Sequence, residues 1–98
     1  MAYWKKLDTI EQILIEKNKL YPFETLEQWV MHMMNTKGVS MSGLHRELSG
    51  MVKELRPEMI FPTQNTVYNY LARKGYTLQT VIIPFGQEVQ ILDKIDAY

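Results

Sequence analysis

The sequence predicts a mainly α-helical domain that ends in a β-hairpin. Apolar residues recur at the spacing of buried helix faces over most of the chain up to residue 75. Beyond residue 76, β-branched and apolar residues form two runs, separated by a turn that contains Pro and Gly. The 98 residues suit one small domain, and the chain contains no internal repeat.

The first predicted helix covers residues 3–20 and ends before Pro22, because the residue before a proline avoids helical geometry. Its apolar positions at helical spacing are Leu7, Ile10 and Leu14. Further isoleucines widen this surface, which leaves two interpretations open. The helix packs on its own domain, or it contacts a second copy of the chain in a dimer.

The second predicted helix begins at Thr25, with Gln28 as its capping-box partner, and ends near Gly38. Its buried stripe consists of Leu26, Trp29, Val30, Met33 and Met34. His32 lies within the methionine cluster, which raises the alternative of a soft-metal site. We favour core packing, because methionine fills irregular gaps and the spacing is helical.

Ser40 or Ser42 caps the third predicted helix. Its inward positions are Leu44, Leu48, Met51, Val52 and Leu55. Gly50 weakens this helix and is a candidate for an early end, and Pro57 stops any helix. Residues 59–61 are apolar and are expected to form a plug before the next helix.

The fourth predicted helix, at 63–75, has the clearest ends, with Thr63 as N-cap and Gly75 at the C′ position. Val67, Tyr70 and Leu71 form a side that faces the core. The opposite side carries no acidic residue and consists of Gln64, Asn65, Tyr68, Asn69 and Arg73. These side chains can read base edges, so we interpret the segment as the recognition helix of a helix-turn-helix.

The C-terminal segment predicts a hairpin, with strands at 77–83 and 89–92 around a turn at 84–87. The apolar run at 81–83 favours a hairpin that covers the core or pairs with another chain. An alternative is that Gln79, Thr80 and Gln87 touch a groove or the backbone of DNA. Residues 93–98 are expected to be a short tail that forms a helical turn.

A family pattern runs through residues 26–76. A Gly-x-Ser step precedes one helix, a Thr-Val pair lies in the next, and a basic-Gly step ends it. The residues of this pattern are Lys37, Gly38, Val39, Ser40, Leu44, Leu48, Asn65, Thr66, Val67, Leu71, Lys74, Gly75 and Tyr76. With this pattern the segment resembles the three-helix core of bacterial and phage helix-turn-helix proteins, of winged or homeodomain-like type, in which these steps open the second core helix and anchor and end the third. We expect a single domain at 1–98, with an N-terminal helix at 1–21 as a candidate dimer element, a helix-turn-helix core at 22–76, and a hairpin wing and tail at 77–98.

The chain departs from this family between residues 49 and 62, where the family has a short turn. Either the second core helix is longer than usual, or an inserted element fills the gap.

The expected DNA-binding residues fall into two groups with different roles. Gln64, Asn65 and Asn69 are expected to pair with adenine, because an amide offers both a donor and an acceptor. Tyr68 reaches a phosphate or a thymine methyl group. The backbone contacts are assigned to Thr63, Arg73, Lys74 and Thr77, and on the preceding helix to Ser40, Ser42 and Arg46.

The net charge is zero, but its distribution favours this half of the chain. Residues 37–80 contain six basic residues and three acidic ones, an excess of three positive charges. Because one copy would bind phosphates weakly, we expect a homodimer on double-stranded DNA. The expected role is transcription regulation or a related DNA transaction, in the cytoplasm or at the nucleoid, and the small size suggests a phage or mobile element.

Other functional classes find less support in the sequence. There is no cysteine and no catalytic or phosphate-loop motif, so we expect no enzyme and no metal or small-molecule cofactor. The segment that contains His45, Arg46 and Glu47 is expected to be an exposed helix face. No apolar run is long enough for a membrane span or a signal peptide.

The main alternative to DNA binding is a small interaction module that binds a host protein, which the zero net charge and acidic C-terminal segment suit. RNA binding is less favoured, because the aromatic residues are dispersed and do not line a sheet.

Overall fold

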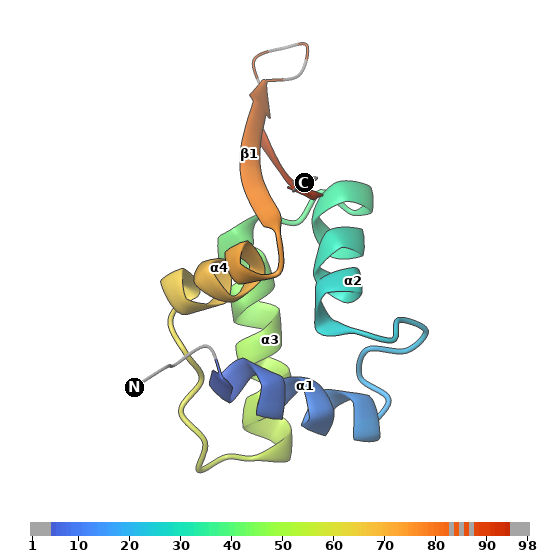
Figure 1. Ribbon diagram of the computed structural model, residues 1–98, viewed down its shortest axis with the longest axis vertical. Coiled ribbons are helices and arrows are strands. Elements are labelled where there is room, and N and C mark those ends of the chain that lie inside the picture. Colours follow the sequence, from blue (N-terminus) through green and yellow to red (C-terminus); the bar gives the residue numbers. More distant parts are fainter. Residues whose placement is uncertain (1–4, 83, 85, 87, 95–98) are drawn as a thin grey trace.

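The computed structural model describes residues 5–82, 84, 86 and 88–94 and confirms a mainly helical chain with a C-terminal hairpin (Figure 1). Its elements are α1 (Lys5–Glu16), α2 (Leu26–Met31), the π-helix η1 (His32–Thr36), α3 (Met41–Leu55), α4 (Gln64–Arg73), β1 (Tyr76–Ile82) and β2 (Glu88–Lys94). None of the helices in this part of the chain is long and apolar enough to cross a membrane.

Helix α1 is shorter than the sequence predicts and ends at Glu16, well before Pro22. Asn18 adopts a left-handed conformation (φ 56°), and the Lys19 N–H donates to the carbonyl of Leu14 (2.9 Å). This is the hydrogen-bonding pattern of a Schellman C-cap, which ends a helix without a proline. Leu7, Ile10 and Leu14 are fully buried, so the apolar stripe of α1 packs on its own domain.

Helix α2 begins at Thr25, as predicted, and Thr25 Oγ1 accepts from the N–H of Gln28 (3.2 Å). The Gln28 side chain accepts from the N–H of Glu24, one residue earlier than a capping box requires. The helix continues without a break into η1, where the Lys37 N–H donates to the His32 carbonyl. Gly38 then turns the chain with φ 69°. Four of the five predicted stripe residues are buried, and Met33 is half-buried.

Helix α3 continues through Gly50 to Leu55, so the first part of the long connection at 49–62 is helical. Helix α3 is therefore long, and 56–63 is a loop without helix or strand. Gly50 is exposed with open space around it, so its predicted early end is wrong. The prediction that residues 59–61 form an apolar plug is also wrong in part. Ile60 is 79% exposed, while its two neighbours are half-buried.

The loop at 56–63 returns along α3, so α4 begins beside the first turns of α3 and not beside its end (Figure 1). His45 Nε2 lies 2.8 Å from the Pro62 carbonyl oxygen. Because a carbonyl only accepts, Nε2 carries the hydrogen. The His45 ring also meets Phe61 edge-on, with 5.2 Å between the ring centroids. A short turn between two helices would not allow this arrangement.

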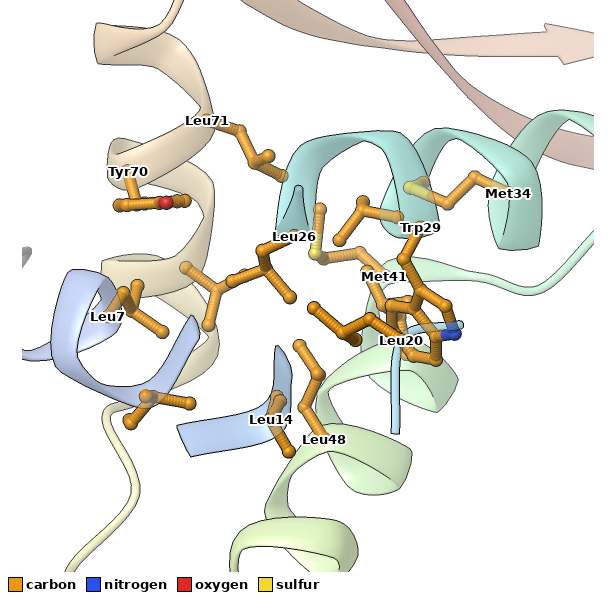
Figure 2. Packing of buried hydrophobic residues seen from close by; sticks show 14 of the residues in the cluster. Leu7, Leu14, Leu20, Leu26, Trp29, Met34, Met41, Leu48, Tyr70 and Leu71 are labelled. Carbon is orange, nitrogen blue, oxygen red and sulfur yellow. The ribbon is translucent and has the colours of Figure 1, made fainter. Parts of the chain in front are cut away.

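One core joins the helices to the base of the hairpin. Figure 2 shows side chains from α1, α2, α3 and α4 meeting around Leu26 and Leu20. The buried residues are Leu7, Ile10, Leu14, Leu20, Leu26, Trp29, Val30, Met34, Met41, Leu44, Leu48, Val52, Val67, Tyr70, Leu71 and Leu92. Leu92 is the one strand residue among them, so the core holds the hairpin at its base.

Gly75 is the single residue between the C-cap of α4 and β1, and its φ of 92° is a conformation that favours glycine. Strands β1 and β2 are antiparallel, with Leu78 opposite Leu92. Toward the tip, Val81 is 39% and Ile82 is 70% exposed. Asp93 and Lys94 belong to β2, so the predicted helical turn is wrong for them. Residues 83, 85, 87 and 95–98 of the predicted strand, turn and tail lie outside the described residues.

Two side-chain amides attach β2 to the helices. Asn35 donates from Nδ2 to the Leu92 carbonyl (2.7 Å) and accepts at Oδ1 from the Leu92 N–H (2.8 Å), as a neighbouring strand would. Gln90 Oε1 accepts from the N–H of Met41 in the first turn of α3 (2.7 Å). These contacts and Leu92 determine how the hairpin stands on the domain.

Replacing Asn35 with Ala is expected to lower the free energy of unfolding by about 1–2 kcal/mol, because both backbone groups of Leu92 lose their partner. Urea denaturation measures the change. Asn65→Ala makes the same chemical change at an exposed helix position and is expected to stay within about 0.5 kcal/mol of wild type. Equal stabilities of the two variants would contradict a role for Asn35 in holding the hairpin.

Candidate nucleic-acid interface

The outer face of α4 presents the amides that the sequence indicates. Gln64, Asn65 and Asn69 are all exposed, and Tyr68 between them is half-buried. Val67, Tyr70 and Leu71 are buried on the other side, so their burial determines which residues face solvent. We call Gln64, Asn65, Tyr68, Asn69 and Arg73 the amide ridge. The first turn of α4 contains no acidic residue.

The second group of predicted contacts lies at the beginning of α3. Ser42 and Arg46 are exposed and one helical turn apart. Ser40 is the N-cap, and its Oγ accepts from the Gly43 N–H (3.2 Å) and lies 3.3 Å from Ser42 Oγ. The first turn of α3 also contains no acidic residue. The hydrogen bond from His45 to Pro62 brings this end of α3 next to the beginning of α4.

His45 itself differs from its prediction. It was expected on an exposed face with Arg46 and Glu47, which are exposed. Its ring is half-buried between α3 and the loop that leads to α4. The interaction partner lies 17 positions away, so local spacing contains no sign of it. A half-buried histidine here positions the two helices relative to each other.

The beginning of α4 is capped by Thr63, whose Oγ1 accepts from the N–H of Thr66 (3.3 Å). Its hydroxyl also lies 3.1 Å from the Thr66 hydroxyl. Thr63 is therefore first a structural cap, although its side chain is exposed at the end of the amide ridge. The N-terminus of a helix, with its free backbone N–H groups and its positive dipole end, favours anions.

The two basic residues at the C-terminal end of α4, which were predicted to contact the DNA backbone, have different surroundings. Arg73 is exposed and follows Asn69 by one helical turn, and together with Lys74 it also lines a hollow beside Asp8 and Tyr70. Lys74 lies on the side of Tyr70, where its Nζ is 3.8 Å from Glu27 Oε2 and 5.0 Å from the centre of the Tyr70 ring. Thr77 is half-buried in β1. The structure thus places Lys74 and Thr77 apart from the amides.

Acidic side chains lie beneath α4, on the side opposite to the amide ridge. Burial raises the pKa of Tyr70 well above its usual range, and the charges of Glu11, Asp8 and Glu27 raise it further. Burial and Glu27 also raise the pKa of Tyr76. Glu11 is held in place because its Oε2 accepts from the N–H of Leu26, at the start of α2 (2.7 Å). The local sequence of α4 gives no sign of this junction, because the carboxylates come from α1 and α2.

The methionine and histidine cluster is part of the packing of α2 and η1. Met34 is fully buried, and Met31 and Met33 pack against the core. The His32 ring lies 4.9 Å from that of Phe23. Among the residues that the structure describes, no group of His, Asp and Glu is arranged to hold a metal ion.

Comparison with known proteins finds no match to any family model, any curated protein or any solved structure.

Replacing Tyr70 with Phe is expected to change how stability depends on pH. The folded pKa of Tyr70 is raised above its unfolded value of about 10, so neutral Tyr70 stabilises the fold below pH 10, and this stabilisation is lost as the pH rises. Without the hydroxyl, the loss is absent. The difference in unfolding free energy between wild type and Tyr70→Phe should shift by up to about 1.4 kcal/mol per pH unit above pH 10.

Urea denaturation between pH 7 and pH 11 measures this difference. Tyr68→Phe removes a hydroxyl from the other side of the same helix and serves as the matched control for the loss of a tyrosine hydroxyl. A Tyr70→Phe profile parallel to that of wild type would show that Tyr70 does not titrate as its surroundings indicate.

Proposed function

We propose that this protein binds double-stranded DNA in a sequence-specific manner, with α4 in the major groove. The observation that carries the proposal is the exposure of Gln64, Asn65 and Asn69 on one face of a helix whose first turn has no acidic residue. In this proposal α2, α3 and α4 form a helix-turn-helix core with a long second helix, and the hairpin is its wing. The biological role is transcription regulation or a related DNA transaction.

The chemistry of the amide ridge suits base recognition. Each Asn or Gln side chain offers a donor and an acceptor on adjacent atoms, which match the N6 and N7 groups of adenine. A recognition helix contacts the bases with its N-terminal residues, and Gln64 and Asn65 are the first two residues of α4. Tyr68 and Asn69 follow one turn later, toward a neighbouring base or phosphate.

The backbone contacts come from the surroundings of the ridge. Ser42 and Arg46 at the beginning of α3 are held beside the beginning of α4 through His45. Arg73 extends the ridge at its other end. This basic footprint is small, which supports a homodimer that doubles it on a two-fold DNA site.

Replacing Asn65 and Asn69 together with Ala is expected to weaken binding to a duplex selected from a random library by at least about tenfold, because a bidentate base contact contributes roughly 1–3 kcal/mol. Fluorescence anisotropy measures the affinity, and circular dichroism checks the fold. Gln12→Ala removes an exposed amide from α1 and should leave binding unchanged. Unchanged affinity of a folded double variant would refute base reading by the ridge.

Binding to random duplex DNA is expected to fall steeply with salt, since contacts to phosphates release counterions. The logarithm of the affinity should decrease linearly with the logarithm of the salt concentration, by about 0.9 per phosphate contacted. Absence of binding at low salt would favour the alternative of an interaction module that binds a protein.

A further inference from the structure

The two edges of the hairpin differ in what covers them. Asn35 occupies the outer edge of β2, since it bonds both backbone groups of Leu92. Those groups therefore point away from β1, which makes Leu92 and Leu78 a pair that exchanges no backbone hydrogen bonds. Such pairs alternate along an antiparallel ladder. The outward backbone groups of β1 therefore belong to Tyr76, Leu78, Thr80 and Ile82.

The outer edge of β1 has no hydrogen-bond partner among the residues that the structure describes. The exposed half of the strand is 79–82, beyond the base that contacts the core. Strand edges in soluble proteins are usually protected by charged side chains, proline or a covering segment. The sequence of β1, YTLQTVI, contains neither a charged residue nor a proline. The backbone groups on this edge are therefore free to pair with another strand.

We propose that β1 pairs along this edge, in antiparallel fashion, with β1 of a second copy of this chain. We place the two-fold axis beside Thr80, in the exposed half of the strand, so that Thr80 faces Thr80 of the partner and Leu78 faces Ile82 of the partner. The two hairpins then form one four-stranded sheet, which is more stable in water than an isolated two-stranded hairpin.

A second copy suits this edge because of its charge and its side chains. In a two-fold pairing every charge would meet a like charge near the axis, and β1 has none. Leu78 and Ile82 cover each other on the face of the sheet that carries Leu92, and Ile82 is 70% exposed in the single chain. By contrast, β2 carries Glu88, Asp93 and Lys94, and its outer edge is already occupied by Asn35.

Helix α1 was the other candidate for a dimer contact. Its stripe residues Leu7, Ile10 and Leu14 are each 0% exposed in the single chain, and the isoleucines that widen the stripe, Ile13 and Ile15, are half-buried, whereas Ile82 of β1 is 70% exposed. The β1 edge specifies the contact behind the homodimer proposed above. Its test uses the oligomeric state without DNA, so a failure of DNA binding and a failure of this contact are distinguishable.

The experiment uses opposite charges at the two-fold axis. Thr80→Lys and Thr80→Glu each place like charges opposite one another, and each is expected to weaken dimerisation of the full chain by at least about tenfold. An equimolar mixture places unlike charges there and should restore the dimer as a heterodimer. Sedimentation velocity over a range of protein concentrations measures all three samples. Gln12→Lys and Gln12→Glu change the charge at an exposed position of α1 and should dimerise as wild type does.

Hydrogen exchange provides a readout that does not depend on variants. The outward amides of Leu78, Thr80 and Ile82 should exchange more slowly as the wild-type concentration rises through the dimerisation range, while that of Leu92 stays constant. A wild-type chain that remains monomeric, or Thr80 variants that dimerise alone as wild type does, would overturn the proposal. A mixture that stays monomeric although both variants are folded would do so as well.

Discussion

The burial of Val67, Tyr70 and Leu71 is the constraint on which the rest of the structure depends. A small core accepts these side chains from one direction, and this determines the rotation of α4 about its axis. The amides of Gln64, Asn65 and Asn69 then face solvent because they lie on the remaining side of the helix. The composition of the exposed face is thus a consequence of the packing beneath it.

Two polar contacts add to the core in holding the helices and the hairpin together. His45 holds the beginning of α4 against α3, and Asn35 holds β2 against η1. Both contacts satisfy backbone groups that the ordinary ladders leave without partners, a carbonyl in the first case and a residue at a strand edge in the second. Together with the buried side chain of Leu92, these contacts fix the helices and the hairpin relative to one another.

Local patterns predict the elements well and their mutual arrangement poorly. The caps Thr25, Ser40 and Thr63 follow from neighbouring residues, and the structure confirms them. The stripes of α2, α3 and α4 also face the core as predicted, although Met33, Met51 and Leu55 are only half-buried. The end of α1 differs because Asn18 supplies a left-handed cap that a glycine usually marks. The burial of His45 and the partners of Lys74 depend on residues from other elements, so no spacing within one helix indicates them. Exposure of the amide ridge was predictable, whereas the separation of Lys74 and Thr77 from it was not.

Gly75 is the only residue between the C-cap of α4 and the start of β1. With φ at 92°, this one residue joins the helix that carries the amides to the strand that carries the open edge, in the orientation that Asn35, Gln90 and Leu92 hold. A side chain at this position would strain the backbone and reorient one element relative to the other. In a two-fold assembly, that reorientation would be doubled and would change the spacing of the two helices.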